Sequence, residues 1–445
     1  MEWYTALSFL LGMILFFMFM GVPVALAFLA ANMIGATYFM GGSGDIWRQM
    51  TRGIGQLTNN ALPTVTSFNL MPVPMFLLMG EFFFHTGLAN KMFGAVDKLM
   101  GRIPGRLSFV TVAGGTAFAT LSGSSMGSTA LLGSLMVPEM QKRGYKKHMA
   151  IGPILGTGGL AMLIPPSALA VLLATLANLD VGRLLIAGVV PGLMLAGFYA
   201  ILILAMCLID PEAAPSYEVD PISWGERLRL FVFDVLPMMS IVVAVILLIL
   251  YGWATPSESA AFGCLGVLLL AIAYRRLTWQ GFVASVTGAL RVTTMALLII
   301  FGSATFSALL AFSGASAGLI KWATQFALDP TVMLLIMFAI LLVLGMFMDQ
   351  LSMMLLTVPI FFPLAQTLGF DLIWFAVILL LALEISFTTP PFGLLLFVMK
   401  GVSAPGTTMR DIYVAALPFM ACSIFLVGLL IIWPQIALWL PSLGV

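Results

Sequence analysis

Long apolar runs, separated by short segments rich in Gly, Pro or charge, fill most of the chain. A helix needs about 20 mostly apolar residues to cross a bilayer, and ten of the runs suit one such helix each. The runs are 4–20, 22–40, 64–86, 148–177, 184–208, 231–252, 255–273, 290–313, 371–400 and 411–437. The pattern predicts an all-α polytopic membrane protein with five simple spans in each half.

Two further apolar runs, 107–140 and 331–363, are too long for one simple span. Each is interrupted near its middle, the first by Ser and Gly around Ser124 and the second between Gly345 and Asp349. Ser and Gly permit a tight reversal of the chain. We therefore predict that each run is a re-entrant helical hairpin, which enters and leaves on one side of the bilayer.

Three shorter segments, 46–60, 88–100 and 278–289, mix apolar residues with charges or amides. Such segments are typical of interfacial helices that brace a moving part. Ordinary surface helices between spans are an equal alternative.

Consecutive prolines interrupt two of the simple spans, at Pro165-Pro166 within 148–177 and at Pro390-Pro391 within 371–400. Each proline removes an amide donor and disfavours helical geometry at the preceding residue. We predict two broken helices, whose free carbonyls can bind a hard cation such as sodium. The alternative at each position is a simple proline kink.

An internal comparison relates the two halves of the chain. A shift of 225 residues places Pro138 on Pro363, Gly144 on Gly369, and the first proline pair on the second. The same shift places the region of Ser124 on Asp349. Chance alignment of proline-containing helices is the alternative. An odd number of spans inverts the second copy, so we predict inverted repeats over 1–208 and 231–445, joined by a polar linker over 209–230.

The distribution of Lys and Arg tests this inversion, because cytoplasmic loops carry the positive excess. If the basic loop before His148 is cytoplasmic, all but four of the 19 Lys and Arg residues lie inside. The four exceptions are Arg48, Arg52, Arg183 and Lys321. This threading predicts a cytoplasmic linker and two termini on the outer, periplasmic side. The first hairpin then opens from the cytoplasm and the second from the other face.

Composition excludes several classes of function. Hydrophobic residues make up 61% of the chain, charged residues 8%, and the net charge is +1, so nothing favours a nucleic-acid partner. The three cysteines and two histidines lack metal-site spacing. The chain has no phosphate-binding loop and no nucleophile elbow. We expect no enzyme activity, no cofactor and no metal other than a coupling ion.

Hydroxyl groups and a few acids within the apolar runs are candidate binding groups. Hydroxyls can hold a carboxylate or an ion without the cost of burying a charge, although close packing of small residues is the alternative. Intramembrane acids indicate function by default, yet Glu384 can equally bond the backbone of a broken helix. Glu81 and Glu258, which have no partner in the other half, are interpreted as structural. The candidate substrate residues are Ser124, Ser128, Thr129, Ser167 and Glu384.

The order of these features along the chain resembles the large membrane subunit of a tripartite ATP-independent periplasmic (TRAP) transporter. The resemblance rests on Ser122 to Thr129, Gly158 to Ser167, Gly345 to Asp349, and Thr388 to Gly393. It covers essentially the whole chain. It implies sodium sites made of backbone and hydroxyl oxygens at the hairpin tips and helix breaks. These map to Ser122, Ser125, Gly159, Ile164 and Pro165 for one site, and to Met348, Asp349, Thr388 and Thr389 for the other.

The resemblance also implies a mechanism and partners. It implies sodium-coupled uptake of an organic acid across the bacterial inner membrane by an elevator motion, as in the ion transporter superfamily. A periplasmic substrate-binding protein would deliver the acid, and a small four-helix membrane subunit would brace the scaffold among the membrane lipids. The family handles C4-dicarboxylates, sialic acids and keto acids, so the substrate is not implied. A stand-alone carboxylate symporter or exchanger is the main alternative; a channel lacks the expected ring of charges.

Overall fold

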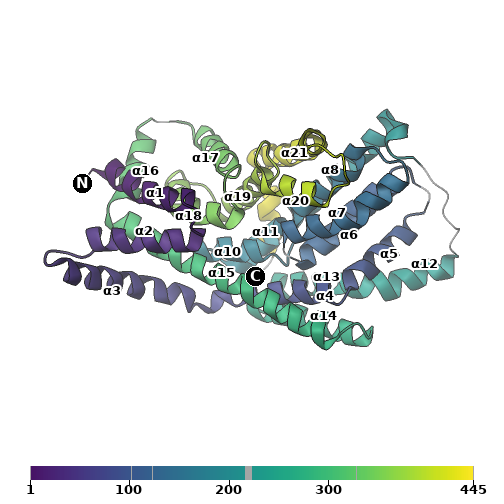
Figure 1. The fold of residues 1–445 in the computed structure, drawn as a ribbon, viewed down its shortest axis with the longest axis horizontal. Coiled ribbons are helices and arrows are strands. Elements are labelled where there is room, and N and C mark those ends of the chain that lie inside the picture. The colour runs from purple at the N-terminus through teal and green to yellow at the C-terminus, as the bar shows by residue number, and fades with distance from the viewer. Residues whose placement is uncertain (1, 102, 123, 216–222, 327, 444–445) are drawn as a thin grey trace.

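The protein is almost entirely helical. A computed structural model describes residues 2–101, 103–122, 124–215, 223–326 and 328–443. Within these ranges every regular element is a helix and there is no strand. This confirms the predicted all-α class. Figure 1 shows the helices packed side by side in one elongated body.

The first half of the chain forms eleven α-helices and two short 3₁₀ helices. These are α1 (Trp3–Phe19), α2 (Val24–Phe39), α3 (Ile46–Val65), η1 (Phe68–Leu70), α4 (Pro72–His85), α5 (Leu88–Leu99), α6 (Arg106–Ser122), α7 (Ser125–Lys142), α8 (Lys147–Gly158), α9 (Leu160–Leu163), α10 (Ala168–Leu176), α11 (Val181–Ile209) and η2 (Pro211–Ala213).

The second half begins after residues 216–222, which lie outside the described part of the predicted linker. Its elements are α12 (Trp224–Leu230), a π-helical turn η3 (Phe231–Val235), α13 (Leu236–Leu250), α14 (Pro256–Ala273), α15 (Trp279–Phe312), α16 (Ala315–Gln325), α17 (Pro330–Leu344), α18 (Gln350–Thr367), α19 (Leu372–Phe387), α20 (Leu394–Val402), α21 (Met409–Ile432) and α22 (Gln435–Leu443). The domain boundaries stay a prediction.

Many of these helices are suited to a bilayer by length and composition. Among the described residues, six helices are long and apolar enough to cross a membrane. A seventh candidate is the pair α8–α9 and α10, which is bent by 46° at the predicted break. Four shorter apolar helices are α1, α2, α17 and α19. The chain is therefore built to pass through a membrane several times.

One predicted span is wrong, and one predicted interfacial segment is part of a longer helix. The run 64–86 is not one helix, because α3 ends at Val65 and α4 begins only at Pro72. Pro72 lacks the amide that would continue the helix, and Ser67 instead caps the short turn η1 by accepting from the amide of Asn69. In contrast, the predicted interfacial segment 278–289 is not a separate helix, because it forms the start of the continuous 34-residue helix α15.

Several element bounds repeat along the chain at the predicted shift. Helices α7 and α18 each have 18 residues, and both of their ends are 225 residues apart. At a shift of 227 residues, close to the predicted one, helices α5 and α16 both start after a glycine in the left-handed region, Gly87 (φ 69°) and Gly314 (φ 71°). The predicted inversion of the second half relative to the first stays a prediction.

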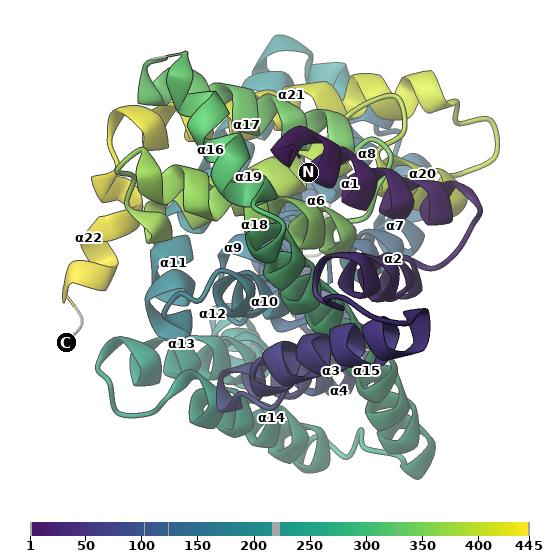
Figure 2. The ribbon, with the colours of Figure 1, turned by 90° about the vertical axis from the view of Figure 1, so that its left-hand side faces the viewer.

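The long helix α15 connects the outer elements of both halves. It packs against α2, α3 and α4 of the first half and against α18 of the second; Figure 2 shows α3 lying along it. Asn32 on α2 is buried and donates to the Gly302 carbonyl (2.7 Å) and to the Thr305 hydroxyl (2.6 Å) on α15. Both hydrogen bonds come from the NH₂ group of Asn32 and fix the register of the two helices, whereas its side-chain carbonyl oxygen has no hydrogen-bond partner among the described residues.

Candidate functional site

At the middle of each hairpin run and at each of the two proline breaks, one helix ends and another begins. New helices begin after Ser124 (α7), Ser167 (α10), Asp349 (α18) and Gly393 (α20). The first three residues cap the new helix with a side-chain oxygen, as Ser and Asp commonly do. The start of a helix carries partial positive charge and suits an anion. The sequence therefore places several helix N-termini inside the packed body.

The tip of the first hairpin run lies against the first broken helix. A Cβ atom added at Gly158 would lie 2.7 Å from the Thr129 hydroxyl and 3.4 Å from the Ser125 carbonyl oxygen. A Cβ atom at the next residue, Gly159, would lie 2.1 Å from the Glu384 carboxyl group. Glycine is required at both positions because any side chain would collide. Residues from α7, the α8–α9 junction and α19 thus converge.

Two hydroxyl groups in this cluster have no hydrogen-bond partner among the described residues. Ser125 is 3% exposed and Thr129 is fully buried, and they lie four residues apart on one face of α7. The Ser125 hydroxyl faces the Glu384 carboxyl group without forming a hydrogen bond of ordinary geometry. The Thr129 hydroxyl also makes none. Buried polar atoms are normally paired, so unpaired oxygens here indicate a place for a ligand.

Glu384 connects this cluster with the second half of the site. Its side chain is 3% exposed, and no Lys, Arg or His of the described chain forms an ion pair with it. Its carboxyl group accepts a long hydrogen bond from the side-chain amide of Gln350, 3.5 Å away at the start of α18. Glu384 therefore lies between the tips of both hairpin runs and the first helix break.

In the second half, Asp349 is engaged by its own helix. One carboxylate oxygen accepts from the amides of Leu351 (3.1 Å) and Ser352 (3.3 Å), and the other accepts from the Ser352 hydroxyl. The preceding Met348 is buried. Gly345, at the end of α17, lies directly against Ser386 of α19, since a Cβ atom there would be 2.1 Å from the Ser386 hydroxyl.

The second helix break lies beside the tip of the second hairpin run. The rings of Phe347 and Phe392 are 5.8 Å apart and join the two. The hydroxyls of Thr388 and Thr389 both donate to the Ile385 carbonyl, over 3.0 and 2.7 Å. Both threonines therefore have free lone pairs, which an ion can use.

The other candidates have more ordinary surroundings. Ser167 is fully buried, donates to the Met162 carbonyl (3.0 Å) and caps α10. Ile164 packs against Gly192 of α11 and, with Pro165, forms the break itself. Ser124 accepts from the Gly127 amide (3.1 Å), and Ser128 is fully buried. Ser122 ends α6, and its side chain lies outside the described residues, as does Gly123.

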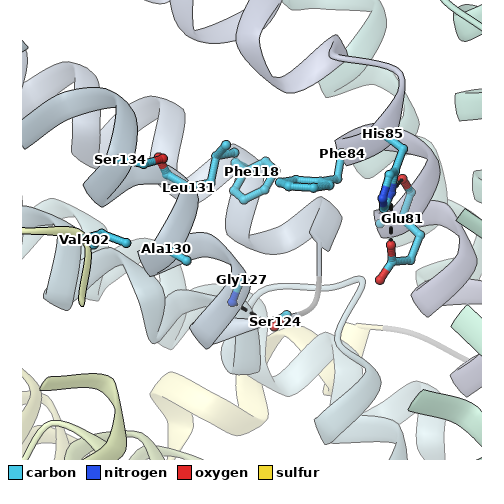
Figure 3. Close-up of a pocket in the computed structure, with 11 residues that line it drawn as sticks. Glu81, Phe84, His85, Phe118, Ser124, Gly127, Ala130, Leu131, Ser134 and Val402 are labelled. Carbon is cyan, nitrogen blue, oxygen red and sulfur yellow. Dashed lines mark hydrogen bonds and ion pairs between the residues drawn. The ribbon is translucent and has the colours of Figure 1, made fainter. Parts of the chain in front are cut away.

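A cavity of about 550 Å³ lies between α4 and the first hairpin run, as Figure 3 shows. Glu81 and His85 form one side, with Nδ1 of His85 3.2 Å from a Glu81 carboxylate oxygen. Ser124 and Gly127, from the start of α7, form another side. The described residues that line it are Gly80, Glu81, Phe84, His85, Phe118, Ser124, Gly127, Ala130, Leu131, Ser134 and Val402. The volume is typical of a small-molecule site.

Sequence reasoning missed the position of Glu81, which it left as structural. The spacing of Glu81 and His85, four residues apart in an apolar helix, was the available signal. Glu258, also left as structural, does cap α14, where it completes a capping box with Thr255. The sequence also gave no sign of the buried pair Tyr199 and Ser423, whose oxygens lie 2.9 Å apart behind Glu384.

Comparison with known protein families shows which family this chain belongs to. The family model described as "Tripartite ATP-independent periplasmic transporter, DctM component" matches residues 11–436. The chain belongs to this family. Its large permeases are transporters and not enzymes, and this permease is a multi-pass inner-membrane protein of a three-part system, as its sequence resemblance predicted.

The relatives of this TRAP large permease differ in the substrates in their names. The C4-dicarboxylate TRAP transporter large permease of Rhodobacter capsulatus is 32% identical over 85% of this chain and 88% of its own length. The ectoine large permease of Halomonas elongata is 28% identical over 96% of both chains. The sialic acid large permease of Vibrio cholerae is 28% identical over 88% of this chain and 90% of its own.

Two solved transporters share the fold of this permease. The Alcanivorax borkumensis YdaH transporter matches with a TM-score of 0.61 at 13% identity, covering 88% of this chain and 90% of its own. The Neisseria gonorrhoeae MtrF structure, described as an antimetabolite efflux pump, matches with a TM-score of 0.58 at 15% identity, covering 92% and 94%. At these identities the likeness extends to the fold alone.

Proposed function

We propose that this TRAP large permease takes up an organic acid with sodium by an elevator motion. The acid is delivered by a periplasmic binding protein, and a small membrane subunit braces the permease. The relatives' names support an organic-acid substrate of variable kind, since they include C4-dicarboxylates, sialic acid and ectoine. Both chain termini face the periplasm in this proposal, following the distribution of basic residues.

The observation that carries sodium coupling is the pair of unpartnered hydroxyls on α7. Sodium is a hard cation that prefers oxygen ligands, and broken helices supply them as carbonyls and hydroxyls. The first sodium site then includes Ser125, Thr129 and the carbonyls around Gly159. The sequence predicts Thr129 as a substrate residue, but its closeness to Gly158 at the helix break supports a place beside the ion instead.

The second sodium site is proposed at the corresponding break in the second half. Its oxygens come from Met348, Asp349, Thr388 and Thr389, which the proximity of Phe347 and Phe392 brings to one region. Asp349 also caps α18, so its carboxylate would serve both the helix and the ion. Glu384, between the two sites, offers carboxyl oxygens to a cation on either side.

The substrate's carboxylate is proposed to bind at the start of α7, where the cavity reaches Ser124. The positive end of the helix favours an anion, and the nearby sodium offsets part of its charge. Ser128 and Ser167, both fully buried, support this site from behind. In this arrangement sodium and carboxylate stabilise each other's binding, which is the physical basis of symport.

Motion is proposed for one block made of α6 to α10 and α17 to α20. These helices contact each other across the breaks, as α7 does with α20 and α9 with α19. The remaining helices form the scaffold around α15. The cavity lies where the scaffold helix α4 meets α6 and α7 of the block, so sliding of the block would carry a bound substrate past the scaffold.

Transport in proteoliposomes tests the proposal. The permease is reconstituted with its small subunit, and uptake of labelled organic acids is measured with and without the binding protein and an inward sodium gradient. We expect uptake only when both are present. Uptake that ignores the binding protein would instead favour a stand-alone carrier, and uptake that ignores sodium would reject the coupling.

A crosslink tests the motion separately. In a variant without Cys207, Cys264 and Cys422, cysteines replace Ser303 on the scaffold helix α15 and Leu355 on the block helix α18, since the Ser303 hydroxyl lies 3.4 Å from the Leu355 carbonyl oxygen. Mercury ions, which bridge two thiols, should stop uptake, and excess thiol should restore it. The matched control replaces Phe82 and Phe282, whose rings are 5.6 Å apart within the scaffold. Full uptake in the first bridged variant would reject the elevator.

A further inference from the structure

The cavity beside α7 has an unusual charge pattern for a carrier of organic acids. Among the described residues that line it there is no Lys and no Arg, and its charged or titratable side chains are Glu81 and His85. With Glu81 ionised, this pair contributes a net charge of zero or minus one, according to whether His85 is protonated. The cavity therefore offers no fixed positive charge on the side away from α7.

Glu81 is held in place by several contacts. Its carboxylate lies 3.2 Å from His85 Nδ1, and its backbone carbonyl accepts from the Ser285 hydroxyl (3.1 Å) on α15. A Cβ atom at Gly288 would lie 2.7 Å from the carboxyl group, so α15 packs directly against it. The side chain is 28% exposed. It is thus partly desolvated, positioned by the scaffold, and accessible from the cavity.

Two aromatic rings lie next to the acid. Phe84 follows Glu81 on α4, and its ring centroid is 6.5 Å from that of Phe118 on α6. Figure 3 shows both rings between Leu131 of α7 and His85, with Ser124 and Gly127 of the α7 start to one side of them. The face of an aromatic ring attracts cations, and it does so more strongly where water is excluded. A carboxylate beside aromatic rings is a recognised environment for an ammonium or amidinium group.

A dianion fits this cavity poorly. If one carboxylate binds at the start of α7, the rest of the molecule extends toward Glu81. A second carboxylate would then meet the Glu81 carboxylate, and no Lys or Arg among the described lining residues offsets that charge. Like charges a few ångströms apart repel strongly in a site from which water is partly excluded. A positively charged or strongly hydrogen-bond-donating group at that end is instead attracted.

We propose that the substrate of this permease is a zwitterion, with a carboxylate at α7 and a cationic nitrogen beside Glu81 and the Phe84 and Phe118 rings. His85 is a positioning residue, which orients the carboxylate of Glu81. This inference rests on the proposed function, because it assumes sodium-dependent binding of a carboxylate in the cavity. It narrows the organic acids to amino, imino or betaine acids and excludes C4-dicarboxylates as the preferred class.

Ligand binding to the permease itself tests this, since transport would also reflect the choice made by the binding protein. The complex of permease and small subunit is placed in lipid nanodiscs, and the midpoint of thermal unfolding is followed against ligand concentration with 100 mM sodium or potassium chloride. One set of probes is glycine betaine, proline, 4-aminobutyrate and ectoine; the other is succinate, fumarate and malate. We expect sodium-dependent stabilisation by at least one zwitterion, at lower concentration than by any dicarboxylate.

Variants then locate the effect. Glu81→Gln keeps the shape of the side chain and should weaken zwitterion binding by about tenfold or more, since a desolvated charge interaction is lost. The control Glu139→Gln also removes an acid from a pair four residues apart, Glu139 and Arg143, but lies outside the cavity and should change nothing. The double variant Glu81→Gln with His85→Arg gives the cavity a positive charge and should improve succinate binding relative to wild type.

The outcomes separate this inference from the function on which it rests. Sodium-dependent binding that favours a dicarboxylate, or zwitterion binding unaffected by Glu81→Gln, would overturn the zwitterion inference and leave sodium-coupled uptake standing. Binding of the acids to the same extent in sodium and in potassium would overturn the coupling. If neither set of acids binds in sodium, both conclusions are wrong.

Discussion

The two hairpin tips of this permease present their oxygens in opposite ways. In the first half, α7 carries neutral hydroxyls at Ser125 and Thr129 that are buried and form no hydrogen bond of ordinary geometry with the described residues. In the second half, the charged Asp349 already accepts from two amides and a hydroxyl of α18. A charge that is satisfied by its own helix stabilises the fold with or without a ligand. Unpaired hydroxyls gain most from a ligand, so we expect the first half to be the more sensitive to sodium.

The largest effect is expected from removing one unpaired hydroxyl. Thr129→Val keeps the shape of the side chain and should raise the sodium concentration for half-maximal uptake by about ten- to a hundredfold, since an interaction with a charged group contributes about 1.5–3 kcal/mol. The control is Thr175→Val, because that hydroxyl already donates to the Val171 carbonyl (2.9 Å). Equal effects of the two substitutions would remove the distinction between paired and unpaired hydroxyls.

A second prediction tests the contact that joins the halves. Gly159→Ala places a methyl group 2.1 Å from the Glu384 carboxyl group, so the free energy of unfolding should fall by about 1–3 kcal/mol. Gly197→Ala is the control, since a Cβ atom there meets nothing within 4 Å and alanine is the better helix former. Thermal unfolding in detergent measures both. A stable Gly159→Ala protein would mean that Glu384 is free to move away.

A smaller effect is expected at the charged tip. Asp349→Asn should weaken the sodium dependence of uptake by a few-fold, because asparagine still caps a helix but carries no charge for an ion. Asp371→Asn offers a close match, since Asp371 caps α19 through the amides of Ile373 (2.9 Å) and Trp374 (3.0 Å). It should leave the sodium dependence unchanged. An unchanged sodium affinity in Asp349→Asn would remove Asp349 from the ion site.

The smallest effect, on thermal stability, is expected from removing an ion pair at the start of the first broken helix. Lys146 pairs with Asp210 over 2.5 Å, and this hydrogen bond lowers the pKa of Asp210 below its usual value of 3.8. A lowered pKa in the folded state adds stability above the unfolded pKa and loses it as the pH falls through the folded pKa. The exposed pair contributes little, so the melting temperatures of wild type and Asp210→Asn should differ slightly at pH 7 and converge below pH 3.8.

The positions of the helix breaks could be predicted from the sequence. The residues that meet at those breaks could be predicted much less well. Ser and Gly at Ser124, and the proline pairs, act through local backbone chemistry, which a sequence shows directly. The contact of Gly159 with Glu384 joins residues far apart in the chain, so no local pattern could indicate it. The family resemblance predicted Asp349 as an ion ligand, whereas its helix-capping hydrogen bonds appear only in the structure.

The difference between local and long-range information also explains the wrong predictions outside the site. The run 64–86 is apolar enough for a span, and apolarity does not reveal that η1 and Pro72 interrupt it. The corresponding part of the second half is continuous because the polar segment 278–289 has no residue that stops a helix before Phe312. Glu81 was left as structural for a related reason, since its cavity is formed by helices from distant parts of the chain.

The continuous helix α15 makes the permease responsive to the thickness of its membrane. Its 34 residues extend about 51 Å at 1.5 Å per residue, whereas the hydrocarbon core of a bilayer is about 30 Å thick. The helix must therefore tilt or place one end along the surface, and a change of bilayer thickness changes that tilt. Because α15 contacts both α4 and α18, lipid chain length becomes a control on how easily the block slides past the scaffold.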